Sequence, residues 1–183
     1  MRKTKTLALG LSKGFTLVEL LVVIAIIGTL ATLLLIMLGT ARAKARDTKR
    51  ISDINQMRTA MEQFFDDNGR YPNTNVKATW DTTLVPRYIA QIPEDPLTPG
   101  CTDYNGGAGC YGYAYTNTAA NPIQFHLWAE LEQLNRAALA GDLDINSTGW
   151  TGAPRDASNP ATTEACATNS LSDRDCIYDT GQR

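Results

Sequence analysis

The sequence has little of what enzymes commonly use for catalysis. Among its 183 residues there is one histidine, His126. No Ser-His-Asp set, pair of catalytic carboxylates, phosphate-binding loop or metal cluster can be assembled from its motifs. His126 shares a face with Gln124 in an alternating segment, so we expect it to be half exposed and not catalytic. The sequence therefore predicts a protein that is not an enzyme.

Negative charge is missing from the start of the chain. The only charged residues in 1–14 are Arg2, Lys3, Lys5 and Lys13. All 19 acidic residues follow, and the net charge of the whole chain is -2. Because a general nucleic-acid binder presents a basic face, the acidic body argues against nucleic-acid binding. The composition is that of one mildly acidic domain behind a basic leader.

The C-x-x-C pairs typical of zinc sites are also absent. The four cysteines are Cys101, Cys110, Cys166 and Cys176. An even number of cysteines in an exported domain more often forms disulfides than binds a metal. Four cysteines allow three connectivities, between which the sequence does not choose. Our prediction is the two short closures, Cys101–Cys110 and Cys166–Cys176, each of which stabilises by roughly 3 kcal/mol in the chain-entropy model.

A run without any charge extends from Leu20 to Leu38. At about 1.5 Å per residue, a helix over this run spans roughly 28 Å, close to the hydrocarbon thickness of a bilayer. A plain single-pass anchor is one explanation. A cleaved secretory signal ending at Ala41-Arg42-Ala43 is another, but the apolar core of such a signal usually runs only about 7–15 residues. We therefore expect a transmembrane helix over 15–38.

Neither explanation accounts for Glu19, which lies at the start of this apolar helix. A carboxylate at the bilayer centre costs about 2.5–3.5 kcal/mol on insertion scales, and less near an interface. No Lys or Arg follows on the same face within the membrane, so we expect the partner to come from another chain or from a new terminus. Glu19 is therefore a candidate functional residue.

The segment Lys13-Gly14-Phe15-Thr16-Leu17-Val18-Glu19 resembles the prepilin cleavage and methylation motif of the type IV pilin and type II secretion pseudopilin superfamily. The resemblance implies that a prepilin peptidase and methyltransferase cuts between Gly14 and Phe15 and methylates the new amine of Phe15. That amine is charged, since an α-amino group titrates near pH 7.7–8.0. Glu19 of one subunit can then pair with the amine of its neighbour and fix the axial register of an assembly.

Beyond Gly39 the pattern becomes amphipathic. Apolar residues recur at spacings of three and four, namely Ile51, Ile54, Met57, Met61, Phe64 and Phe65. Asn68-Gly69, soon followed by Pro72, predicts the end of the helix. We expect the helix to continue over 39–69 and to lay its apolar stripe on a small globular head.

The segments 67–72 and 88–96 resemble the end of the helix and the following loop in major pseudopilins of the G type. Farther on, alternating residues predict strands over 111–115 and 123–131. The expected fold class is α+β, with a long N-terminal helix packed on a small antiparallel β-sheet head that has disulfide-closed loops. The expected parts are a cleaved leader 1–14, a transmembrane helix 15–38, an amphipathic continuation 39–69, a globular β head 70–140 and a polar C-terminal loop or tail 141–183.

One acidic turn has two interpretations. Asp142, Asp144 and Asn146 alternate like the first ligands of a calcium loop. Ser147 stands where that loop needs a glycine, and no glutamate follows at the twelfth position. A plain polar turn is the more economical interpretation, whereas the resemblance supports calcium, because some pseudopilins bind calcium in their heads. No other cofactor is expected.

The resemblance implies a structural subunit of a filament, either a type IV pilus or a type II secretion pseudopilus. Implied partners are copies of itself and other pilins in a helical filament, and a membrane assembly platform. The implied location is a single-pass membrane protein with the leader inside and the head outside the cytoplasm, and then an extracytoplasmic filament. The alternative is a minor pilin that acts as an adhesive or DNA-uptake binding module. Glu19 favours a stacking subunit, since subunits at a filament tip can lack that acid.

Overall fold

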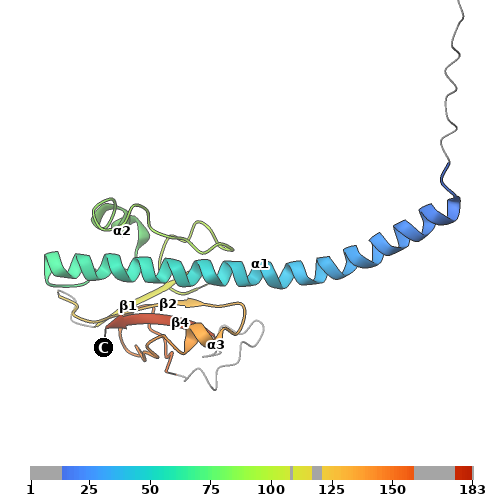
Figure 1. The fold of residues 1–183 in the computed structure, drawn as a ribbon. Helices are drawn as coiled ribbons and strands as arrows, with labels where there is room; N and C mark the ends of the chain where they lie inside the picture. Colours follow the sequence, from blue (N-terminus) through green and yellow to red (C-terminus); the bar gives the residue numbers. More distant parts are fainter. Residues whose placement is uncertain (1–13, 108, 117–120, 159–175, 183) are drawn as a thin grey trace, which may run out of the picture. The chain divides into compact units, whose positions relative to one another are not determined.

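The computed structural model describes residues 14–107, 109–116, 121–158 and 176–182. Its elements are helices α1 (Leu17–Asn68), α2 (Lys77–Thr83) and α3 (Arg136–Leu139) and strands β1 (Gly112–Tyr115), β2 (Phe125–Glu130), β3 (Thr151–Gly152) and β4 (Ile177–Gln182). All of them except the two-residue β3 are labelled in Figure 1. The chain divides into two compact units, Met1–Ala41 and Arg42–Arg183, and α1 contributes to both.

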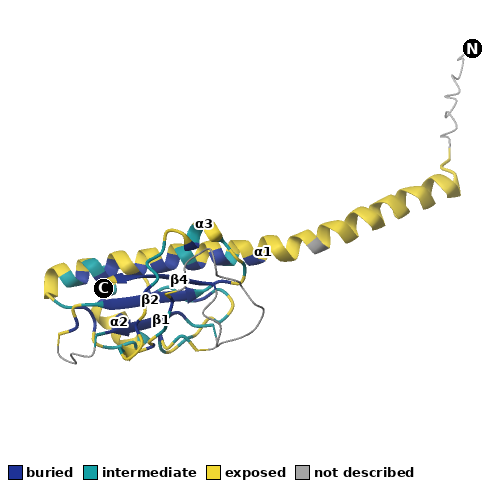
Figure 2. Ribbon diagram, turned by 90° about the horizontal axis from the view of Figure 1, so that it is seen from below, coloured by how far each residue is buried: buried dark blue, intermediate teal, exposed yellow. Residues whose placement is uncertain are grey.

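The described part of the first unit is the beginning of the chain and the first half of α1. Every side chain in it whose exposure is described is exposed, as Figure 2 shows in yellow. Leu17 is 77% exposed and Leu35 is 71% exposed, although both are strongly apolar. By length and composition this half of α1 can cross a membrane. A helix that is apolar on every face needs lipid or other protein around it.

In the second unit α1 carries the predicted apolar stripe. Ile54, Met57 and Met61 are almost fully buried, and Figure 2 shows such residues in dark blue on one side of the helix. The helix ends at Asn68, as the sequence predicted. Gly69 follows with a φ of 67°, a left-handed conformation that glycine adopts without steric cost, and its N–H donates to the carbonyl of Phe65.

A four-stranded antiparallel sheet in the order β3-β1-β2-β4 packs on this half of α1. The two strands predicted from alternation are confirmed as β1 and β2, which pair with Tyr113 opposite Leu127. Together with the long helix, the sheet confirms the α+β fold class. The short helix α2, whose Trp80 is completely buried, also joins the core and was not predicted from the sequence.

The end of the chain differs from the expected polar tail. Strand β4 pairs with β2 over its whole length, and its residues are buried except for the last. Polar composition was a poor guide here, because the polar groups of Asp179 and Thr180 are buried inside the sheet structure. This strand therefore belongs to the head.

Strand β2 is buried on both faces, so the sheet is covered on its second side as well as on the side of α1. Phe125 and Leu127 join the core beneath α1, whereas Trp128 packs with Ala153 in a smaller second core. Trp128 also lies against Gly112, where an added Cβ would be 2.0 Å from the indole ring. Only glycine fits this close contact.

The loop before β1 is closed by the predicted disulfide Cys101–Cys110, with an S–S distance of 1.96 Å. The second predicted pair, Cys166–Cys176, involves Cys166, which lies outside the described residues. Cys176 is buried in the head. The pairing of these two cysteines stays a prediction.

Candidate functional site

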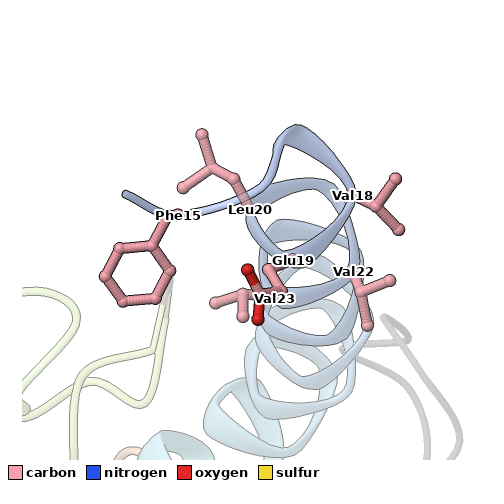
Figure 3. Close-up of a pocket in the computed structure, with 6 residues that line it drawn as sticks. All are labelled: Phe15, Val18, Glu19, Leu20, Val22 and Val23. Carbon is pink, nitrogen blue, oxygen red and sulfur yellow. The ribbon is translucent and has the colours of Figure 1, made fainter. Parts of the chain in front are cut away.

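The N-terminal end of α1 brings together the residues of the predicted cleavage and assembly motif. Gly14 and Phe15 precede the helix, and Phe15 is 90% exposed. Figure 3 shows its ring beside a shallow, mainly apolar depression, whose other lining residues are Val18, Glu19, Leu20, Val22 and Val23. Glu19 supplies the carboxylate of this depression. Cleavage at Gly14/Phe15 and methylation of Phe15 stay predictions.

Glu19 has a partner within its own chain that the sequence analysis missed. Its carboxylate accepts hydrogen bonds from the backbone N–H of Thr16 at 2.9 Å and from the Thr16 hydroxyl at 2.8 Å. In return, the N–H of Glu19 donates to the Thr16 hydroxyl at 3.2 Å. This is a capping box, and the Thr-x-x-Glu spacing in the sequence was the signal that could have revealed it.

The capping box changes what a neighbouring subunit must supply. In a single chain the carboxylate is already hydrogen-bonded to Thr16, so a second chain is not the only source of hydrogen-bond donors for Glu19. One carboxylate has several lone pairs, so it can accept a further donor beside Thr16. A cationic amine at the same helix N-terminus is the kind of donor this geometry can accept.

A second charged centre lies in the head, around Arg50. This side chain is 4% exposed and donates hydrogen bonds to three carboxylates: Asp47 at 2.8 Å, Asp95 at 2.5 Å and Glu132 at 2.7 Å. Burial opposes the charge of Arg50, but these hydrogen bonds outweigh it and raise the pKa of Arg50 above its ordinary value. Arg50 therefore joins α1 to two separate loops of the head.

The carboxylates around Arg50 are themselves held by the backbone. Asp47 accepts the N–H groups of Glu132 and Gln133, each at 2.9 Å. Asp95 accepts the N–H of Leu97 at 2.8 Å. The hydrogen bond from Arg46 is the main reason that the pKa of Glu132 lies below its ordinary value. The cluster thus fixes how the head sits on its helix.

The histidine is not half exposed, as the sequence predicted, but completely buried. Its Nδ1 lies 2.7 Å from the hydroxyl of Ser147, and its Nε2 lies 3.0 Å from the carboxylate of Asp179. The sequence prediction was wrong because it considered one strand alone, whereas the segment around Ser147 covers the outer face of the sheet. Ser147 is also fully buried, so a substrate in solution cannot reach its hydroxyl.

The acidic turn considered for calcium is organised around Asp179. The backbone N–H groups of Leu143, Asp144 and Ile145 donate to this carboxylate at 3.0, 3.0 and 2.7 Å. Asp144 has a positive φ of 47°. In the described part of the chain there is no group of three or more His, Cys, Asp or Glu side chains that could hold a metal ion. Calcium binding by Asp142, Asp144 and Asn146 stays a prediction.

Comparison with known proteins supports the interpretation of the N-terminal motif. Residues 10–35 match the family model described as the prokaryotic N-terminal methylation motif. The chain is 39% identical over 103 residues to type II secretion system core protein G of Pectobacterium carotovorum. The aligned part covers 50% of this chain and 64% of the relative. It is 42% identical over 106 residues to the protein of the same name from Klebsiella pneumoniae, covering 48% of this chain and 76% of the relative.

A fimbrial protein of Neisseria meningitidis is 35% identical over 84 residues, which is 45% of this chain and 49% of that protein. No solved structure matches the chain significantly. The chain thus spans a little under two thirds of the Pectobacterium relative but about three quarters of the Klebsiella relative. With this identity and coverage added to the long helix and its capped glutamate, the chain belongs to the family of type II secretion system core protein G.

Proposed function

We propose that this chain is a structural subunit of a type II secretion pseudopilus or a closely related type IV pilus-like filament. The observation that carries the proposal is the first half of α1, which is apolar and exposed on every side around a single carboxylate. Such a surface is compatible with a bilayer before assembly and with a bundle of like helices afterwards. The proposed role is structural rather than enzymatic.

The partners in this proposal are copies of the chain and other pilins in a helical filament, with a membrane assembly platform. A prepilin peptidase and methyltransferase would act at Gly14 and Phe15. The chain would cross the membrane once, with its leader in the cytoplasm and its head outside. The Cys101–Cys110 disulfide supports this orientation, because disulfides persist in oxidising compartments outside the cytoplasm.

A minor pilin that displays an adhesive or DNA-uptake module is the less favoured alternative. Several of the relatives carry the name core protein G, and Glu19 is present at the position where a stacked subunit is expected to use it.

Calcium at the turn formed by Asp142, Asp144 and Asn146 remains an additional proposal for the head. It is tested by measuring the unfolding midpoint with calcium and with a chelator.

The assembly proposal is tested with Glu19→Ala. We expect normal abundance of the protein in the membrane, because removing an acid makes the span more apolar. Filament yield should fall strongly, because the neighbouring Phe15 amine would lose its partner, and truncating one partner of a buried pair costs about 3–5 kcal/mol. Glu19→Asp should be intermediate. The measurement compares the membrane fraction with sheared filaments.

The matched control is Glu62→Ala, which removes an acid from the half of α1 that belongs to the head. Glu62 forms only a surface pair with Arg58 at 3.6 Å, so this variant should assemble normally. N-terminal sequencing of the membrane protein should give Phe15. A normal filament yield for Glu19→Ala would refute the proposed register role, and a terminus at Lys44 would refute the filament proposal itself.

A further inference from the structure

Five basic residues follow the apolar segment closely, and the structure divides them into two groups. The five are Arg42, Lys44, Arg46, Lys49 and Arg50. Three of them are paired with carboxylates: Arg46 with Glu132, Lys49 with Asp53 one turn along α1, and Arg50 with three carboxylates. Arg42 and Lys44 are exposed, and within the described residues their side chains have no ion pair or hydrogen bond.

Depth along the helix separates the same two groups. Measured from Leu38 at about 1.5 Å per residue, Arg42 lies roughly 6 Å and Lys44 roughly 9 Å beyond the apolar run. The polar layer on each side of the hydrocarbon is about 5–8 Å thick. Helical side chains point back toward the N-terminus, so both of these cations reach toward that layer. Lys49, at roughly 17 Å, lies beyond it.

The directions of the two side chains distinguish between the partners that fit them. Successive helical residues are turned by about 100°, so Arg42 and Lys44 point about 160° apart, one on each side of the buried Ala43. One face of a second protein cannot cover both. Lipid headgroups surround a spanning helix on all sides, so phosphates are within reach of both cations at once.

We propose that Arg42 and Lys44 bind the phosphates of phospholipids in the leaflet on the side of the head, and that they set the depth of the subunit in the membrane. Both cations are long, flexible and free to extend their charged ends to the headgroups. Anionic phospholipid gives the strongest attraction, since each basic residue near such a surface contributes independently. This inference goes beyond the proposed function and depends only on the membrane span.

The test uses the full chain in nanodiscs of equal phosphatidylglycerol and phosphatidylcholine, followed by native mass spectrometry of the lipids that stay bound. The wild type should retain phosphatidylglycerol in excess. Arg42→Gln and Lys44→Gln should each lower the bound glycerol-to-choline lipid ratio about fivefold, and the double variant about 25-fold. The leader is the same in every variant, so its own lysines and arginine do not affect these differences.

The matched control is Arg58→Gln, which removes one exposed positive charge from α1 about 24 Å farther from the membrane than Arg42. This variant should keep the wild-type lipid ratio. If the double variant also keeps that ratio, the proposal is overturned. An unchanged lipid ratio together with a lower filament yield would assign the two cations to a second copy of the chain instead. The Glu19 test is unaffected by either result.

Discussion

Glu19 and Arg50, which lie in the two halves of α1, are held by their partners in different ways. Glu19, in the first half, is held by Thr16, three residues away. Arg50, in the second half, is held by Asp95 and Glu132, which are 45 and 82 positions away in the sequence. The capping box needs only the first turn of the helix, whereas the contacts of Arg50 with Asp95 and Glu132 exist only when the head is folded. One helix thus contains a charged group whose partner is local in the sequence and another whose partners are brought close by the tertiary fold.

The largest expected effect comes from Arg50→Met. This change leaves Asp47 and Asp95 buried without their cation, and breaking such a cluster typically costs about 3–5 kcal/mol. The measurement is urea unfolding of the detergent-solubilised chain, followed by tryptophan fluorescence. All three tryptophans lie in the second unit, so the signal reports on the head.

The control for this comparison is Arg58→Met in the same helix. Arg58 is exposed and has a long surface pair, so its loss should change the free energy of unfolding by less than about 1 kcal/mol. Equal effects of the two variants would contradict the view that the cluster depends on burial.

The Cys101–Cys110 disulfide is a local link within the head, since it joins residues nine positions apart. The double variant Cys101→Ser and Cys110→Ser should lose about 3 kcal/mol of unfolding free energy in the chain-entropy model. Reducing the wild type with dithiothreitol should shift the urea midpoint at least as far, because the reductant also opens the predicted Cys166–Cys176 bond. A variant as stable as the oxidised wild type would show that the loop is already ordered without the bond.

A smaller effect is expected from Thr16→Val at the N-terminal end of α1. It removes the hydroxyl that caps the helix, and losing such a cap costs about 1 kcal/mol of helix stability. Amide hydrogen exchange of the chain in detergent should accelerate in the first turn of α1 and stay unchanged in the head. Faster exchange in both units would contradict the separation between local and tertiary interactions.

The smallest expected effect is a dependence of head stability on acid pH. The pKa of Glu132 is lowered in the folded chain by its hydrogen bond from Arg46, so Glu132 binds its proton more readily when unfolded. Its contribution is fully present above about pH 4.3, the ordinary glutamate value, and is lost as the pH falls through the lower folded pKa. Unfolding midpoints between pH 7 and 3 should show this loss, and Glu132→Gln should reduce the slope. An identical slope in that variant would assign the acid sensitivity to other carboxylates.

Local patterns in the sequence predicted local features well. The apolar run, the stripe through Ile54, Met57 and Met61, and the stop at Asn68 depend on spacing within one helix, and the structure confirms them. Strands β1 and β2 were predicted from alternation for the same reason. The short disulfide Cys101–Cys110 was also within reach of sequence reasoning, because a loop of this size closes at low entropic cost.

Features that depend on distant partners were missed or mispredicted. His126 was expected at the surface, yet a segment about twenty residues later covers it and places Ser147 against its ring. The expected tail contains β4, whose place in the sheet depends on pairing with a strand about fifty residues earlier. No spacing rule identifies such neighbours, because the chain between them does not determine where it returns.

The sequence by itself determined the membrane-length helix, the glutamate at its start and the family of this chain, because each of these depends on residues that are consecutive in the chain. The tertiary structure alone decided which basic residues form ion pairs with carboxylates that are distant in the sequence. Arg46 and Arg50 find distant carboxylates in the head, whereas Arg42 and Lys44 have none within reach among the residues that the structure describes. The physical reason is that a buried charge needs a partner brought within hydrogen-bonding distance, and only the folded chain brings Asp95 and Glu132 to Arg50.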